Sequence, residues 1–145
     1  YDELFQSGKG FTDVDECQRF VSETGCDWLS VAVGNIHGAV ARATKDQKKV
    51  QARLNLEHLA QLATVAQIPL VLHGGSGIHQ EYILPAIKHG IAKINVATEI
   101  RQAYEQTLAA EGSVECAQRV VYERTRWLLN EYYHISNTRT LVNPT

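Results

Sequence analysis

The sequence predicts a parallel α/β fold, because short apolar runs alternate with helical patterns along the chain. The runs at residues 28–33, 68–72 and 92–96 are mostly apolar, which is typical of strands buried on both faces of a parallel sheet. The connections between runs and helices are short, which favours repeated strand–helix units. An open doubly wound sheet fits this alternation, but an arc of a (β/α)8 barrel better explains the residues that end each strand.

Helical patterns follow each apolar run and also precede the first. The first helix is expected to begin with Thr12 as its hydroxyl N-cap, to carry acids in its first turn, and to end at Gly25. Leucines from Leu54 onwards mark the next helix, and Tyr82 to Ile87 mark another that Gly90 closes. Further helices are expected over residues 98–110 and 114–133, and a tail over 136–145. No linker interrupts the pattern, so we expect a single unit over residues 1–145.

Composition narrows the class of protein. The 145 residues match the size of one domain, and a net charge of −2 gives no electrostatic basis for binding nucleic acid. No apolar run reaches the ~18–20 residues that span a bilayer. The three cysteines lack metal-ligand spacing, and Cys17 and Cys26 are expected to be small buried hydrophobic residues in a reducing cytoplasm. We therefore expect a cytoplasmic protein without a nucleic-acid or membrane partner.

Polar residues and glycines follow each predicted strand. The three strands end in Gly34-Asn35-Ile36-His37-Gly38, in His73-Gly74-Gly75-Ser76-Gly77 and in Asn95-Val96-Ala97-Thr98. In a barrel of parallel strands these ends meet at one rim, where active sites lie. Each signal alone is weak, since a single histidine is more often structural and the glycine turn lacks a P-loop lysine. Together, however, imidazoles could meet one Zn²⁺, and the glycines could let backbone N–H groups approach a phosphate.

Three sequence blocks carry a family resemblance. Residues 31–38, 69–78 and 93–99 closely resemble consecutive blocks of the class II ketose-bisphosphate aldolases, and Phe11-Thr12-Asp13 is similar to the family's lead-in. That family includes the fructose- and tagatose-bisphosphate aldolases. The resemblance covers essentially residues 7–135. It implies that the chain is the C-terminal part of a (β/α)8 TIM barrel, whose N-terminal strands are absent from this chain.

The resemblance also implies a set of site residues. His37 and His73 would be two of the three histidine ligands of a catalytic Zn²⁺, and Asn95 would act catalytically by contacting the enediolate. Carbonyls around Gly38 and Gly74, with Ser76, would hold a monovalent cation, Na⁺ or K⁺. The residues implied to bind dihydroxyacetone phosphate are Gly38, Gly74, Gly75, Ser76, Asn95, Val96, Ala97 and Thr98.

The implied reaction is zinc-dependent, reversible aldol cleavage of a ketose 1,6-bisphosphate, fructose or tagatose, to dihydroxyacetone phosphate and an aldehyde through a metal-stabilised enediolate. Such a lyase belongs to carbohydrate metabolism, including glycolysis, and family members are homodimers or homotetramers. Ala97 resembles the tagatose-type members. The family's acid/base aspartate and third zinc histidine form an Asp-His pair on an earlier strand. No Asp-His pair occurs here, so we expect this chain alone to lack both groups.

Other interpretations of the same residues stay open. A non-catalytic half-barrel could bind phosphate without a metal. A zinc-dependent hydrolase on the same fold would use the metal to activate water, although it leaves the Asn95 block unexplained. Lys93 is interpreted as structural. The histidines away from strand ends are interpreted as surface or packing residues; they are His58, His79, His89 and His134.

Overall fold

The computed structural model describes residues 2–35 and 52–142. The chain forms two compact units, Tyr1–Ala97 and Thr98–Thr145. Each unit is described by itself below. The expectation of a single unit over residues 1–145 stays a prediction, because compactness does not show whether the two parts fold separately.

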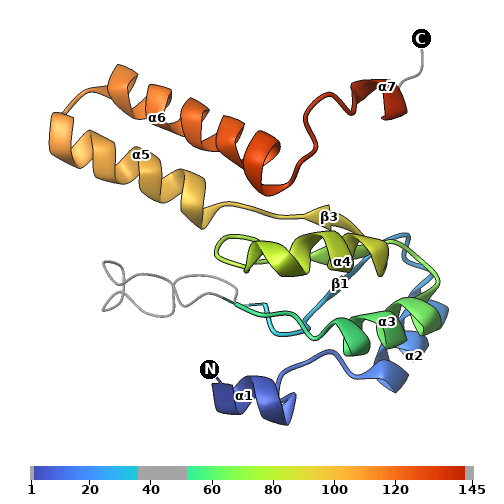
Figure 1. The fold of residues 1–145 in the computed structure, drawn as a ribbon. Helices are drawn as coiled ribbons and strands as arrows, with labels where there is room; N and C mark the ends of the chain where they lie inside the picture. Colours follow the sequence, from blue (N-terminus) through green and yellow to red (C-terminus); the bar gives the residue numbers. More distant parts are fainter. Residues whose placement is uncertain (1, 36–51, 143–145) are drawn as a thin grey trace. The chain divides into compact units, whose positions relative to one another are not determined.

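The first unit contains a parallel sheet. Strands β1 (Leu29–Val31), β2 (Leu70–Leu72) and β3 (Ile91–Ile94) lie in the order β1-β2-β3, as Figure 1 shows. Val31 is opposite Leu72, and Leu72 is opposite Ile94. This confirms the predicted α/β fold. The spatial order follows the chain order, as in an arc of a barrel, and does not reverse as it does at the centre of a doubly wound sheet.

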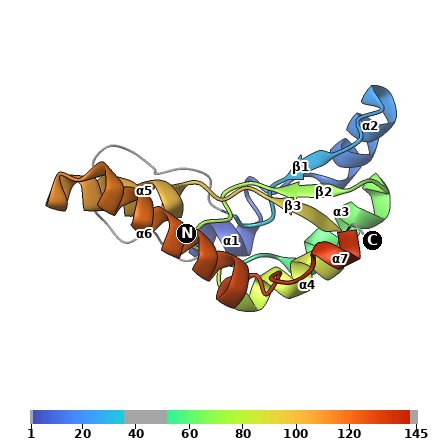
Figure 2. The ribbon, with the colours of Figure 1, turned by 90° about the horizontal axis from the view of Figure 1, so that it is seen from above.

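Helices cover one side of this sheet. Helices α3 (Leu56–Ala66) and α4 (Ile83–Lys88) lie along the same side, and the short 3-10 helix η2 (Gln80–Tyr82) leads into α4 (Figures 1 and 2). All three residues of β2 are buried, as expected for a central strand with neighbours on both edges. The largest fully buried side chains form an aliphatic core: Leu54, Leu59, Leu62, Leu70, Leu72, Ile78, Ile83 and Val33.

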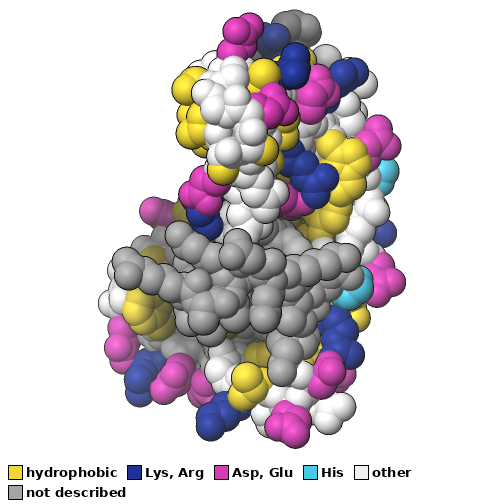
Figure 3. All heavy atoms as spheres, turned by 90° about the vertical axis from the view of Figure 1, so that its left-hand side faces the viewer, with side chains coloured by type: hydrophobic (Ala, Val, Ile, Leu, Met, Phe, Trp, Pro, Cys, Tyr) yellow, Lys and Arg dark blue, Asp and Glu magenta, His cyan; other side chains and the backbone are white. Residues whose placement is uncertain are grey.

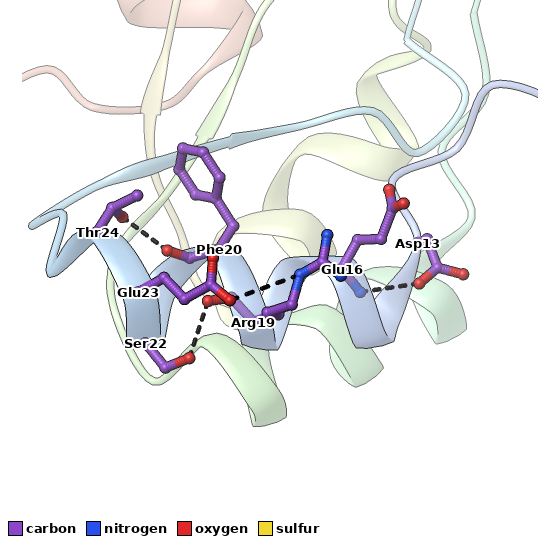
Figure 4. A network of polar contacts seen from close by, with 7 residues as sticks. All are labelled: Asp13, Glu16, Arg19, Phe20, Ser22, Glu23 and Thr24. Atoms are coloured by element: carbon purple, nitrogen blue, oxygen red, sulfur yellow. Dashed lines mark hydrogen bonds and ion pairs between the residues drawn. The ribbon is translucent and has the colours of Figure 1, made fainter.

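The N-cap of helix α2 (Val14–Thr24) lies one residue later than predicted. Asp13, not Thr12, is the N-cap, and its carboxylate accepts a hydrogen bond of 2.9 Å from the Glu16 amide (Figure 4). The helix ends at Gly25, whose φ of 63° is left-handed, so the predicted end is confirmed. Cys17 is buried as predicted. Burial raises the pKa of its thiol, which agrees with the predicted packing role.

Thr12 forms hydrogen bonds with Ala32, the residue after β1, and does not cap the helix. Its amide donates to the Ala32 carbonyl at 2.8 Å, and the Ala32 amide donates to its hydroxyl at 2.9 Å. The Thr12 carbonyl also lies 2.7 Å from Nε2 of His58 on α3. The prediction of Thr12 as N-cap was therefore wrong, because its hydroxyl is engaged by a strand twenty residues away.

Several element boundaries differ from the prediction. The strands are shorter, and Trp28, expected in the first strand, precedes β1 and is 53% exposed. Helix α1 (Asp2–Ser7) was not predicted, and α7 (Arg139–Val142) lies in the predicted tail. The predicted helix 114–133 consists of α6 (Val114–Trp127) followed by the π-helix η3 (Leu128–Tyr132).

The second unit is a helical hairpin of α5 (Thr98–Glu111) and α6. The turn uses Gly112, with a φ of 66°, and Ser113, whose hydroxyl caps α6 by accepting from the Cys116 amide at 3.2 Å. Arg124 on α6 forms an ion pair with Glu99 on α5. The same guanidinium lies 4.2 Å from the centre of the Trp127 ring. Arg124 therefore links the two helices by charge, while its stacking on Trp127 is a contact within α6.

Tyr133 follows the π-helix and is 8% exposed. Within the described residues its hydroxyl is the one buried side-chain polar atom that has no hydrogen-bond partner. Burial raises the pKa of this hydroxyl, and the neighbouring Tyr132 raises it further. The hydroxyl is thus kept neutral at a cost in stability.

Charged side chains of both signs are interspersed on the surface. On the face drawn in Figure 3, Lys and Arg side chains lie among Asp and Glu side chains over the described residues. This mixture agrees with the small net charge of −2. In the part of the chain that the structure describes, none of the helices has the length and apolar character needed to cross a membrane.

Candidate active site

The candidate site is built from the carboxyl ends of parallel strands. His73 directly follows β2, and Asn95 directly follows β3. Because these strands are parallel neighbours, their carboxyl ends lie at the same edge of the sheet. His73 and Asn95 are both half-buried there. The structure therefore brings together two residues that the sequence predicted to share a site.

The Asn95 amide lies over the His73 ring. Its Nδ2 atom is 3.3 Å from Nδ1 and 3.2 Å from Nε2 of His73. An atom in the plane of the ring cannot be so close to both nitrogens without meeting the carbon between them. The amide N–H group therefore faces the π surface of the imidazole and does not use an in-plane lone pair. The lone pair of a neutral imidazole nitrogen is the group that binds a metal.

Backbone hydrogen bonds hold these two residues in register. The Asn95 amide donates to the Leu72 carbonyl at 2.9 Å, and the Asn95 carbonyl accepts from the Gly75 amide at 2.9 Å. The ladder between β2 and β3 thus continues past the residues that form the strands. His73 lies between these two contacts, so its backbone is fixed on the β3 side.

Gly75 is needed for close approach to β3. A Cβ atom at this position would lie 2.5 Å from Cγ2 of Ile94 and 3.1 Å from the Asn95 carbonyl oxygen. Since the Gly75 amide already donates to Asn95, this glycine serves the packing of the turn against the strand. The sequence suggested that it serves phosphate approach, and that role stays a prediction.

The rest of the glycine turn is compact. Gly74 has a left-handed φ of 68°, and Ser76 is 4% exposed. Beyond the turn, Ala52 pairs with Ile78 in an isolated parallel bridge. The Ala52 amide donates to the Gly77 carbonyl at 2.8 Å, and the His79 amide donates to the Ala52 carbonyl at 3.0 Å. The chain that approaches α3 is therefore attached to the end of the glycine turn.

Asn35 contributes a contact that the sequence analysis did not assign. Its Nδ2 atom donates to the His73 carbonyl at 2.8 Å, and its Oδ1 atom accepts from the Val33 amide at 2.9 Å. This side chain links the end of β1 to the residue that follows β2. An asparagine beside a glycine is an ordinary turn signal, so nothing in the local sequence distinguishes this role.

The remaining predicted site residues divide into two groups. Val96 is half-buried and Ala97 exposed in the connection after β3, and Thr98 begins α5 in the second unit. His37 and Gly38 lie outside the described residues. The predicted Na⁺ or K⁺ site includes Gly38, so it stays a prediction.

The histidines expected to be structural behave differently from one another. His58 is half-buried and its ring packs 5.5 Å from that of Phe11. His79 is half-buried, whereas His89 and His134 are exposed. Lys93 is exposed in the middle of β3, not at the strand start.

The described residues fit part of a zinc site. Within residues 2–35 and 52–142, no three or more His, Cys, Asp or Glu side chains are grouped to hold a metal ion. His73 could supply one ligand, because zinc accepts neutral imidazole nitrogen. His37, the other predicted ligand, lies outside the described residues.

Comparison with known proteins identifies the family. Residues 2–139 match the family described as class-II fructose-bisphosphate aldolase. The chain belongs to this family, as its sequence blocks predicted.

Individual relatives agree with this assignment. The chain is 43% identical over 97 residues to "Uncharacterized protein YdjI" of Escherichia coli K12, covering 67% of this chain and 32% of that protein. It is 43% identical over 94 residues to the 6-phospho-5-dehydro-2-deoxy-D-gluconate aldolase of Shouchella clausii, covering 65% of this chain and 29% of that protein.

Solved structures show the same fold. The crystal structure of the YdjI aldolase from Escherichia coli K12 superimposes with a TM-score of 0.69 at 34% identity, covering 84% of this chain and 46% of that one. A putative fructose-1,6-bisphosphate aldolase from Coccidioides immitis gives a TM-score of 0.69 at 24% identity, covering 87% and 44%. The chain thus spans less than half the length of these relatives, as expected for part of a (β/α)8 barrel.

Proposed function

We propose that this chain supplies the ketone- and phosphate-binding half of a metal-dependent aldolase that cleaves a ketose phosphate to dihydroxyacetone phosphate and an aldehyde. The observation that carries the proposal is the meeting of His73 and Asn95 at the carboxyl ends of β2 and β3, in a chain of the class-II aldolase family. An imidazole that can bind a metal and an amide that can donate to an oxygen anion are two of the groups that this reaction requires at one place.

The proposed roles follow from these groups. His73, together with His37, would hold Zn²⁺, which when bound acts as a Lewis acid on a carbonyl oxygen. The Asn95 amide would donate a hydrogen bond to the oxygen that gains charge as the carbon–carbon bond breaks. The glycine turn would bind the phosphate through backbone N–H groups, with a monovalent cation at Gly38, Gly74 and Ser76.

The substrate class can be stated by its shared chemistry. The ketone of a ketose 1,6-bisphosphate is next to a phosphate-bearing carbon. The name of the Shouchella clausii relative describes the same arrangement, with the ketone at position 5 and the phosphate at position 6. Retro-aldol cleavage of either compound leaves dihydroxyacetone phosphate from the three-carbon end that carries both the ketone and its neighbouring phosphate. The two candidates differ only in the aldehyde that is released.

One assay tests these substrates. The purified whole protein, including the part proposed to carry the acid/base aspartate and the third metal histidine, is incubated separately with each of three compounds: fructose 1,6-bisphosphate, tagatose 1,6-bisphosphate and 6-phospho-5-dehydro-2-deoxygluconate. Dihydroxyacetone phosphate is followed with a coupled dehydrogenase. We expect release from at least one compound, loss of release with a chelator, and recovery with added Zn²⁺.

Other outcomes distinguish the alternatives. Phosphate-ligand binding that ignores the chelator, without cleavage, supports a non-catalytic half-barrel. Zinc-dependent release of inorganic phosphate from the substrate, without formation of dihydroxyacetone phosphate, supports a hydrolase. The acid/base aspartate and the third metal histidine are proposed to lie on another part of the protein. We further propose that the active protein is a cytoplasmic homo-oligomer, a dimer or a tetramer, which its solution mass would test.

A further inference from the structure

Strand β1 separates from β2 just before the site. The paired register ends at Val31 opposite Leu72. Two residues later, the Val33 amide donates to the Asn35 side chain at 2.9 Å, and the Val33 carbonyl accepts from the Asn55 amide at 2.8 Å. Neither polar group of the Val33 backbone therefore continues the ladder to β2 beyond this point.

The Asn35 side chain replaces the missing ladder contact. Its Nδ2 atom reaches the His73 carbonyl at 2.8 Å, across 38 positions of sequence. The orientation of this amide is fixed by its two partners, because a flipped amide would place two donors face to face at Val33 and two acceptors face to face at His73. The side chain thus forms two hydrogen bonds that only an asparagine-like amide can form together.

The same peptide segment is held from the other side by β3. The Leu72 carbonyl accepts from the Asn95 amide, and the Gly75 amide donates to the Asn95 carbonyl. The backbone around His73 is therefore held on the β3 side by Asn95 and on the β1 side by Asn35. The direction of the His73 side chain depends on both, because a side chain projects from its Cα at an angle fixed by the backbone.

We infer that Asn35 is a positioning residue for His73, which sets the backbone from which the imidazole reaches the metal. The link to the metal rests on the proposed function. The contact between Asn35 and His73 does not. Outer partners that orient a metal-binding histidine typically change metal affinity by about 10- to 100-fold when they are removed, and the same range is expected here.

The variants are Asn35→Asp, which keeps the acceptor for Val33 but loses the donor for His73, and Asn35→Ala, which loses both. Asn55→Ala is the matched control. Asn55 donates from its backbone to Val33 and caps α3 through its side chain, which accepts from the His58 amide at 2.9 Å. Its replacement loosens the neighbouring helix but removes no hydrogen bond to His73.

Two readouts separate positioning from general stability. The first is measured without metal. It compares the NMR chemical shifts of the His73 ring and of the Gly74 amide nitrogen, which belongs to the same peptide group as the His73 carbonyl. The second is the Kd for Zn²⁺, measured by competition with a chromophoric chelator. We expect both Asn35 variants to move the NMR signals and to weaken Zn²⁺ binding by about 10-fold or more, and Asn55→Ala to change neither.

Each contrary result has a definite meaning. Unchanged His73 signals in Asn35→Asp, or equal changes in Asn55→Ala, would overturn the positioning role. Changed NMR signals with an unchanged Kd would overturn its effect on the metal. If the unsubstituted protein binds no Zn²⁺, the proposed metal chemistry fails, and the NMR comparison alone decides whether Asn35 positions His73.

Discussion

The two compact units differ in which residues they bury and in what the buried residues support. The first unit has an aliphatic core under its sheet, and this core supports polar groups where the strands end. In the second unit the buried residues of the described part are Ala117, Leu128 and Tyr133. Its largest exposed hydrophobic side chains are Val114, Tyr122, Trp127, Leu129, Ile135 and Leu141.

The difference shows how secondary structure limits where a site can form. Parallel strands bring residues far apart in sequence to one edge, so His73 and Asn95 meet there through a continuous ladder. In the helical hairpin, the ion pair between Arg124 and Glu99 joins residues that face each other from two helices. We therefore expect substitutions at the strand ends of the first unit to affect metal binding, and substitutions within the helical hairpin, beyond Thr98, to affect only stability.

The largest expected effect is that of His73→Ala. Loss of a metal ligand should weaken Zn²⁺ binding by more than about 100-fold, because it costs more than loss of an outer partner. Aldol cleavage should fall with it, while the unfolding midpoint stays close to that of the unsubstituted protein. His89→Ala, at an exposed position after α4, is the control. Equal Zn²⁺ affinity in both variants would show that His73 is not a metal ligand.

Gly75→Ala should have the next largest effect. The added Cβ would lie 2.5 Å from Ile94, and such overpacking costs about 1–3 kcal/mol. Gly112→Ala in the second unit is the comparison. Its Cβ would meet no atom within 4 Å, although its φ of 66° carries strain. Urea denaturation measures both variants, and only Gly75→Ala should also weaken Zn²⁺ binding.

Arg124→Ala tests the hairpin. Removing a partly exposed ion pair and a cation–π contact should destabilise the second unit by about 1 kcal/mol. Arg126→Ala removes a more exposed pair with Glu123 at 4.0 Å, which should matter less. Circular dichroism during urea denaturation measures both. An effect of Arg124→Ala on Zn²⁺ affinity would contradict the separation of roles between the units.

Tyr133→Phe should have the smallest effect at neutral pH, and it should be stabilising. Removing a buried hydroxyl without a partner should stabilise the protein by up to about 1 kcal/mol. The raised pKa of Tyr133 means that above pH ~10 the unfolded hydroxyl ionises before the folded one. Stability is therefore lost as the pH rises, and Tyr133→Phe should lose less of it.

Urea denaturation at neutral pH and above pH ~10 provides the measurement for Tyr133→Phe. Tyr122→Phe, at an exposed tyrosine of the same unit, is the control. If Tyr133→Phe destabilises the protein at neutral pH, the hydroxyl must form a hydrogen bond, and the contrast with the polar contacts of the first unit disappears.

Much of the fold was predictable because its signals are local. Apolar runs, glycine ends and leucine spacing placed β1 to β3 and the helices near their observed positions. The placement of His73 and Asn95 at one edge followed from parallel pairing alone. The π-helix was missed because residues 128–132 continue the composition of α6, and composition does not distinguish a π turn from an α turn.

The parts that were missed depend on distant side chains. Thr12 was interpreted as a helix cap, because a hydroxyl before acidic residues has that local meaning, but it bonds to Ala32. Asn35 was predicted to follow the first strand, but no role was assigned to it. Its partner is a carbonyl 38 residues away. In both cases a polar side chain continues a backbone ladder, and neither sequence position shows which backbone it will meet.

The attachment of Asn35 and Ala52 to one turn has a consequence for how the turn can open. Asn35 bonds to His73 at the start of the glycine turn, and Ala52 bonds to Gly77 at its end. The Ala52 amide donates to Gly77 and the His79 amide donates to Ala52, so both bonds break when this end of the turn opens. In hydrogen exchange these two amides should therefore be protected together, as members of one cooperative unit.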